Sequence, residues 1–111
     1  MAYYNRGYAY DELGQYDKAI ADCNKAIQLD PTLFPAYNNR GFAYYHQEEY
    51  EKAIVDYNKA IQLDPTVAIA YSNRGYVYYE LGQHEKTISD FTGAIRLNPD
   101  LADSYHNRDP A

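Results

Sequence analysis

The side chains of this 111-residue chain that could ligate a metal ion or attack a substrate are three histidines and one cysteine. His46, His84 and His106 are far apart, and none has a cysteine or carboxylate partner at the spacing of a zinc site. His84-Glu85 lacks the second histidine of a zinc-protease helix. Cys23 has no evident neighbouring base to activate it. We therefore predict that the chain is not an enzyme and has no catalytic residue, metal site or cofactor.

A second group of side chains has chemistry suited to holding a peptide. An asparagine amide offers both a donor and an acceptor to an extended backbone, and an aromatic ring gives contact area at low entropic cost. Both types recur at related positions along the chain, where core packing would favour apolar residues over asparagine. The candidate peptide-binding residues are Tyr4, Asn5, Tyr8, Asn38, Asn39, Phe42, Tyr45, His46, Asn73, Tyr76 and Tyr79.

The balance of charged residues narrows the choice of partner. Ten Lys and Arg against sixteen Asp and Glu give a net charge of −6, which argues against binding nucleic acid. An acidic surface favours a neutral or basic segment as ligand. No apolar run approaches the roughly 18 residues of a membrane helix, and no secretory leader opens the chain. We expect no membrane partner and a cytoplasmic location by default, although a single cysteine leaves the redox compartment open.

The elements that must position these side chains are repeated. Pro31, Pro65 and Pro99 recur every 34 residues, and the same offset relates the three Asn-Arg-Gly triplets at 5–7, 39–41 and 73–75. A fixed period of this length indicates stacked structural units. We predict one repeat domain over residues 1–111, with copies at 1–33, 34–67 and 68–101 and a partial helix at 102–111.

Each copy is expected to form two helices. Small and aromatic residues of the middle copy recur at +4 and +7, which is one stripe of a helical face: Tyr37, Gly41 and Tyr44, then Ala53, Tyr57 and Ala60. Asp64-Pro65 should end the second helix, because a residue before proline avoids the α region. Thr32 and Thr66 should cap the helices that follow.

A glycine recurs inside the first helix of each copy, at Gly7, Gly41 and Gly75. A mid-helix glycine costs about 1 kcal/mol relative to alanine, so its recurrence needs a structural reason. We expect close approach of the second helix, with alanines such as Ala53 and Ala60 on the opposite side.

The pattern resembles the tetratricopeptide repeat. The residues that carry the resemblance in the middle copy are Tyr37, Gly41, Tyr44, Tyr50, Ala53, Tyr57, Ala60 and Pro65, and nearly the whole chain follows them. Departures occur at Cys23, His84 and Thr87. The resemblance implies an all-α fold, a right-handed superhelical stack of antiparallel helix hairpins (an α-solenoid). It also implies a protein–protein interaction scaffold whose inner curve forms a peptide-binding groove.

Some members of that family hold a carboxylate-terminated peptide with a clamp of three cations and two asparagines. The corresponding positions here are Tyr4, Tyr8, Asn39, Ile69 and Asn73, of which only Asn39 keeps the family residue. Every cation of the clamp is replaced. We therefore expect a ligand other than an acidic carboxyl-terminal tail.

Arginines and aspartates form two columns with the same period. Arg40 and Arg74 belong to the first column, and Asp56 and Asp90 to the second. The arginines could form a track for an anion, or each could pair with an aspartate of its own copy or of the preceding one. The acidic net charge favours pairing.

The alternative function is self-assembly into homo-oligomers. The terminal helices have no capping helix in the sequence, so they could stack end to end. In addition, Glu48 stands where the other hairpin turns have Gly14 and Gly82. Because Gln47, Glu48 and Glu49 are good helix formers, the two helices of the middle copy could fuse and exchange between protomers.

Overall fold

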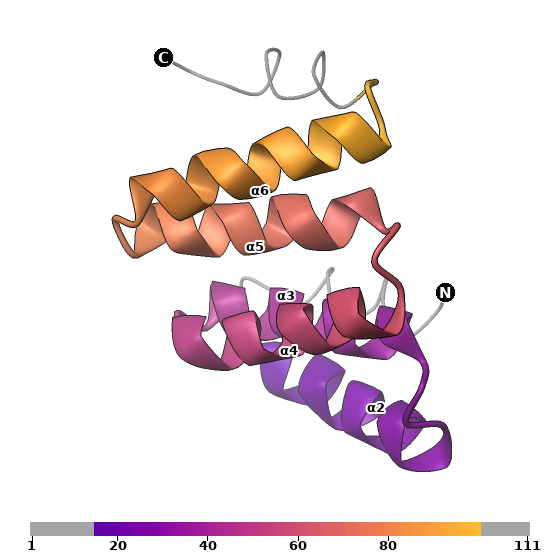
Figure 1. Ribbon diagram of the computed structural model, residues 1–111. Helices are drawn as coiled ribbons and strands as arrows, with labels where there is room; N and C mark the ends of the chain where they lie inside the picture. The colour runs from indigo at the N-terminus through magenta and orange to yellow at the C-terminus, as the bar shows by residue number, and fades with distance from the viewer. Residues whose placement is uncertain (1–14, 101–111) are drawn as a thin grey trace. The chain divides into compact units, whose positions relative to one another are not determined.

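The computed structural model describes residues 15–100, which form five α-helices and no strand (Figure 1). The helices are α2 (Tyr16–Leu29), α3 (Phe34–His46), α4 (Tyr50–Leu63), α5 (Ala68–Glu80) and α6 (His84–Leu97). The prediction of an all-α fold built from helix hairpins is confirmed: α3 and α4 are the hairpin of the second copy, and α5 and α6 that of the third.

The chain divides into two compact units, Met1–Pro65 and Thr66–Ala111. In the first unit α3 packs against both α2 and α4, and in the second unit α5 packs against α6. The contact of α2 with α3 joins the first copy to the second. The predicted first helix of the first copy and the predicted partial helix at 102–111 lie outside the described residues. The single domain over 1–111 remains a prediction.

The second helix of each copy ends where the sequence predicts. Helices α2, α4 and α6 stop at leucines that precede Asp30-Pro31, Asp64-Pro65 and Asn98-Pro99. The residue before each proline is extended, as Asp64 illustrates with φ −149° and ψ 96°. Its N–H still donates to the carbonyl of Ala60 at 3.0 Å. The proline therefore fixes the end of the helix through the steric restriction on its neighbour.

The predicted threonine caps are wrong. α3 begins at Phe34 after Leu33, and α5 begins at Ala68 after Val67, without a side-chain cap in either case. The Thr32 hydroxyl instead donates to Asp30 Oδ1 at 2.7 Å, and the Thr32 N–H donates to the same oxygen at 3.0 Å. These hydrogen bonds lower the pKa of Asp30 and close the turn after α2. The Thr32 side chain is thus used in the turn between α2 and α3 and does not cap α3.

The turns inside the two hairpins have the same backbone geometry. In the second copy Glu49 N–H donates to the Tyr44 carbonyl at 2.8 Å and Glu48 N–H to that of Tyr45 at 2.9 Å. Gln83 and Gly82 make the equivalent bonds in the third copy, at 2.9 and 3.0 Å. This is the Schellman motif, which needs a left-handed residue after the helix. Gly82 adopts φ +75° and Glu48 φ +62°, so the second copy forms an ordinary turn around a non-glycine residue.

Replacing Glu48 with glycine should stabilise the folded chain by about 1 kcal/mol. A residue with a β-carbon is strained at positive φ, whereas glycine is not. Replacing the glycine of the equivalent turn, Gly82→Ala, should lower the stability of the folded chain by a similar amount. Urea denaturation of both variants beside the wild type measures these differences. Equal stability of all three chains would contradict the strain.

The helical glycines lie against aromatic rings. A β-carbon added to Gly41 would lie 2.9 Å from Tyr57 Cε1, and one added to Gly75 would lie 2.7 Å from Phe91 Cε1. The predicted close approach of the second helix is therefore confirmed, but the predicted opposing alanines are not the nearest groups. A glycine without a β-carbon at these positions leaves room for the ring of the second helix. Cys23 occupies the corresponding position of the first copy.

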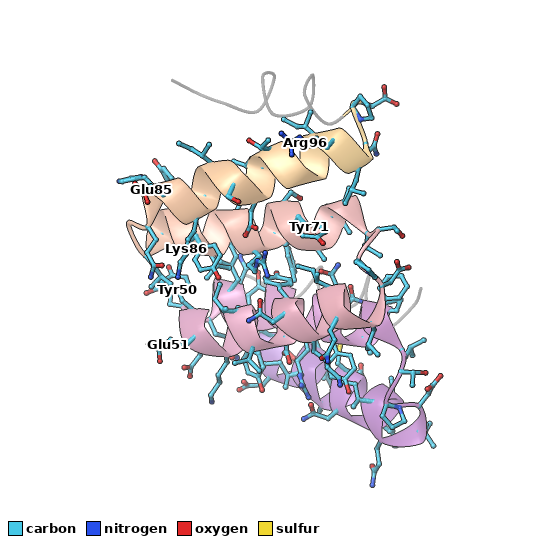
Figure 2. All side chains as sticks on the ribbon, viewed as in Figure 1. Tyr50, Glu51, Tyr71, Glu85, Lys86 and Arg96 are labelled. Atoms are coloured by element: carbon cyan, nitrogen blue, oxygen red, sulfur yellow. The ribbon has the colours of Figure 1, made fainter. Side chains whose placement is uncertain are left out.

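The alanines instead fill the remaining core beside these rings. Ala53 and Ala60 are completely buried in α4, and Tyr57 between them is 1% exposed. In the second unit Ala70, Val77 and Ala94 are completely buried. Tyr71, which is labelled on α5 in Figure 2, approaches α6: its Cδ1 would lie 3.9 Å from a β-carbon on Gly93. Small residues thus leave room for the large aromatic rings in the core.

Candidate functional site

Three of the candidate peptide-binding residues meet on α3 in an aromatic cluster, which consists of Tyr16, Phe42, Tyr45, His46 and Tyr50. The His46 ring stacks on Tyr16 of α2, with centroids 5.1 Å apart and planes at 3°. It also meets Phe42 at 4.4 Å and Tyr45 at 5.1 Å in edge-to-face contacts. Tyr45 in turn contacts Tyr50 of α4 at 5.8 Å. Three helices of the first unit therefore contribute to one aromatic cluster, in which Tyr16 is buried and His46 is exposed.

The sequence analysis missed two members of this cluster, Tyr16 and Tyr50. The sequence contained a pattern that could have identified them, since Tyr16, Tyr50 and His84 occupy equivalent positions of the 34-residue period. That column stands at the start of the second helix of each copy. In the first unit it lies beside the last turn of α3, which is why Tyr16 and Tyr50 reach His46 and Tyr45.

Two asparagines precede this cluster on α3. Asn38 and Asn39 are both half-buried. Within residues 15–100, no hydrogen bond to the side chain of Asn39 is formed. A half-buried amide normally has a hydrogen-bond partner, because leaving its donor and acceptor unmatched costs free energy. Asn39 is thus able to bind an external donor or acceptor without breaking a bond to another described residue.

The second unit presents a smaller set of candidates on α5. Asn73 and Tyr76 are half-buried, and Tyr79 is 59% exposed. The Tyr76 ring packs edge-on against Phe91 of α6 at 5.1 Å, so part of its surface is used inside the unit. Tyr79 contacts the exposed His84 ring at 6.5 Å. Tyr79 is therefore the most accessible candidate of this unit.

The candidate residues Tyr4, Asn5 and Tyr8 lie outside the described residues. The structure brings together Phe42, Tyr45 and His46 in the first unit. Asn73, Tyr76 and Tyr79 belong to the second unit and lie on α5. Assignment of these residues to peptide binding remains a proposal.

The arginine and aspartate columns pair within the second and the third copy. Arg40 Nε and Nη2 donate to the two carboxylate oxygens of Asp56 at 2.8 and 2.7 Å. Arg74 and Asp90 repeat this two-point bridge with the same distances. The aspartates are nearly completely buried, with 2% and 5% exposure. The prediction of structural pairing is confirmed for both described arginines, since their guanidinium groups are occupied by a carboxylate.

Arg40 also connects two copies of the repeat. Its Nη1 donates to Asn24 Oδ1 of α2 at 2.8 Å, while the bridge to Asp56 extends to α4. The guanidinium carbon lies 5.6 Å from the centre of the Tyr37 ring, a cation–π contact. Hydrogen bonding to Asp56 raises the pKa of Arg40, so the guanidinium is charged at neutral pH. One side chain thereby links α2, α3 and α4.

Cys23 is half-buried in α2, near Arg40, Asp22 and Asp56. Burial raises the pKa of its thiol to about 11, Arg40 acts in the opposite direction, and Asp22 and Asp56 raise it further. The thiol is therefore almost fully protonated at neutral pH. A protonated thiol is a poor nucleophile and a poor metal ligand.

We expect iodoacetamide to alkylate Cys23 slowly in the folded chain. At pH 8 the thiolate fraction falls about 100-fold when the pKa rises from the ordinary value of 9.0 to about 11. The rate in native buffer should be at least about 100-fold below the rate in urea. Mass spectrometry of timed samples gives both rates, and comparable rates would contradict a buried thiol.

Two general features of the described residues bear on function. Between residues 15 and 100, no three His, Cys, Asp or Glu side chains are grouped so that they could hold a metal ion. None of the five helices in that range combines the length and apolar character needed to cross a bilayer.

Comparison with known families and structures gives a consistent result. A family model described as "Tetratricopeptide repeat" matches residues 1–33 and 68–101. A second model with the same description matches 23–55, and one described as "TPR repeat" matches 43–82. No curated protein matches the chain.

Solved structures similar to this chain include two of RPAP3. The first is the NMR structure of the first TPR domain of human RPAP3, with 30% identity, a TM-score of 0.80, and coverage of 87% of this chain and 76% of that one. The second is the first TPR of Spaghetti (RPAP3) bound to the HSP90 peptide SRMEEVD, with 30% identity, a TM-score of 0.79 and coverage of 88% and 78%. A crystal structure of MamA is 29% identical with a TM-score of 0.76, and the chain covers 60% of its length.

Proposed function

Since the chain belongs to the tetratricopeptide repeat family, we propose that it is a non-enzymatic scaffold that binds a peptide segment of a partner protein. The contacts are made by the first helices of its copies, α3 in the first unit and α5 in the second. The residues assigned to this role on the two helices are Asn38, Asn39, Phe42, Tyr45, His46, Asn73, Tyr76 and Tyr79.

The observation that carries this proposal is the position of Asn39. Its amide is half-buried and makes no hydrogen bond to a described residue. It lies on α3, the helix that also carries Phe42 and His46 of the aromatic cluster. An extended peptide would supply a backbone N–H and a carbonyl to the Asn39 amide. Its side chains would then contact Phe42, one helical turn further along α3. In the second unit, considered by itself, Tyr79 offers an accessible ring on α5.

The ligand that we propose is a neutral or basic segment. The RPAP3 domains are bound to the peptides SRMEEVD and SGPTIEEVD, both of which end in glutamates, valine and aspartate. In this chain, tyrosine, isoleucine and asparagine stand where related clamps have cations. The net charge of −6 also disfavours an acidic tail. Charge complementarity therefore favours lysine or arginine in the bound segment.

A peptide-library pull-down followed by titration tests this function. We expect the wild type to enrich neutral and basic sequences and to bind SRMEEVD at least about 10-fold more weakly than the best library peptide. An Asn39→Ala, Asn73→Ala double variant should bind the peptide at least about 10-fold more weakly, since in the proposal each amide makes hydrogen bonds to the backbone of the bound peptide. The control is Gln62→Ala, an exposed amide on α4, which should bind like the wild type.

Three results would contradict the proposal. Equal recovery of peptides by the wild type and the asparagine variant would remove Asn39 and Asn73 from the binding surface. Preferential binding of SRMEEVD would overturn the charge preference. Absence of any enriched peptide, together with size that grows with protein concentration, would favour self-assembly as the function.

A further inference from the structure

The turn between α3 and α4 places a poorly suited residue at the one position that must be left-handed. Glu48 has φ +62°, whereas the same position in the next hairpin is Gly82 with φ +75°. Glycine takes this conformation freely, and a residue with a β-carbon does so at a cost. The hydrogen bonds of the two turns are otherwise alike, so the residue type is what distinguishes them.

The residues of this turn are well suited to a continuous helix. Gln47, Glu48 and Glu49 are all strong helix formers, and no proline interrupts the chain between Tyr37 and Asp64. In a continuous helix Glu48 would precede Lys52 by four residues, the favourable order for an ion pair. In the hairpin, by contrast, the Lys52 ammonium lies 5.5 Å from the Tyr44 ring centre. Straightening the turn would therefore relieve strain at Glu48 and gain a helical ion pair.

The interface that straightening breaks can be rebuilt between two molecules. α3 and α4 are joined by the contact of Gly41 with Tyr57 and by the bridge from Arg40 to Asp56. When two chains open together, Gly41 can receive the partner's Tyr57 and Arg40 can receive the partner's Asp56. Every α3–α4 contact is then retained, as in other exchanges of identical elements. Two hydrogen bonds to α2 come from Arg40 and from the first hinge residue, Gln47: Arg40 Nη1 to Asn24 Oδ1 at 2.8 Å and Gln47 Nε2 to Asp17 Oδ1 at 2.6 Å.

We propose that this chain forms a dimer with a second copy of itself by exchanging α4 and the residues that follow it. Residues 47–49 are the hinge, and α3 and α4 become one helix from Phe34 to Leu63. The partner is specified by the interface itself, because a second copy offers the same Tyr57 ring and Asp56 carboxylate in the same geometry. The equivalent turn of the third copy stays closed, because Gly82 is not strained at positive φ and is a poor residue for a continuous helix.

Size and hinge variants test the exchange in the full chain. After refolding over a range of concentrations, light scattering should give a mass near twice 12.8 kDa at high concentration. Glu48→Gly should weaken the dimer at least about 100-fold, because it relieves the turn and disfavours the continuous helix in both protomers. Glu49→Gly, next to the strained position, is the matched control and should weaken it only about 10-fold. A monomer at every concentration would overturn the proposal.

A distance measurement separates exchange from surface association. Spin labels at Leu33→Cys and Gln62→Cys, in a Cys23→Ser chain diluted with unlabelled protein, report the separation of the far ends of α3 and α4. A continuous helix separates positions 33 and 62 by about 44 Å at about 1.5 Å per residue, whereas the hairpin keeps them at the same end. The long distance should appear only in the dimer fraction. A dimer with the short distance alone, or equal weakening by the two glycine variants, would overturn the exchange.

Discussion

Replacing Arg40 with alanine is expected to lower the free energy of unfolding by about 3 kcal/mol. The change leaves the carboxylate of Asp56, which is 2% exposed, without its charged partner. It also removes the hydrogen bond to Asn24, the link from α3 to the preceding copy. Asp56→Ala should cost less, about 2 kcal/mol, because 21% of the Arg40 side chain already reaches solvent. Urea denaturation followed by circular dichroism measures both values.

Two controls separate loss of the bridge from a general loss of positive charge. Lys25→Ala removes an exposed cation of α2 and should change stability by less than about 0.5 kcal/mol. Replacing both partners, as Arg40→Met with Asp56→Leu, should cost less than Arg40→Ala alone, since no buried charge is then left without a partner. Under conditions in which the Arg40→Ala variant is folded, its affinity for the peptide should differ from that of the wild type by less than about 3-fold. A large fall in affinity with unchanged stability would instead assign the arginine column to anion binding.

Gly75→Ala is expected to destabilise the second unit by about 2 kcal/mol. The new β-carbon would lie 2.7 Å from Phe91 Cε1 and 2.9 Å from Cδ1. The ring is held by its contact with Tyr76, so it cannot turn aside without breaking that packing. It would also lie 3.3 Å from Asp90 Cβ, the residue bound to Arg74. The overpacking should exceed the roughly 1 kcal/mol gained from alanine in a helix.

Gly93→Ala is the matched control on the facing helix. Its β-carbon would have Tyr71 Cδ1 as nearest neighbour at 3.9 Å, an ordinary van der Waals contact. With no clash, the helix propensity of alanine should raise stability by up to about 1 kcal/mol. Thermal and urea denaturation of both variants should give shifts of opposite sign. Shifts of the same sign would mean that the spacing between α5 and α6 does not discriminate between the two glycines.

The sequence was sufficient to predict the five described helices and the ends of α2, α4 and α6. The 34-residue period and the apolar stripes indicated where the helices lie. Each second helix ends in the same way, because the proline restricts the backbone of the residue before it, as at Asp64-Pro65. Pairing of Arg40 with an aspartate was also predictable, because two columns of opposite charge shared one period, but the structure decided that its partner is Asp56 of its own copy. The threonine caps were wrong for a local reason that the pattern did not reveal, since Thr32 bonds Asp30 instead.

The candidate site depended on information that a linear pattern does not contain. The sequence identified Asn39, Phe42, Tyr45 and His46 by type, but only the packing of α2 and α4 against α3 brings Tyr16 and Tyr50 to them. Likewise, the recurrence of Gly75 indicated a close approach of the second helix, but only the structure shows that the ring of Phe91 makes it and that Gly93 has room for a methyl group. Periodicity determined which face of each helix is apolar. The distances between side chains of different helices came only from tertiary packing, because they depend on how closely the helices approach.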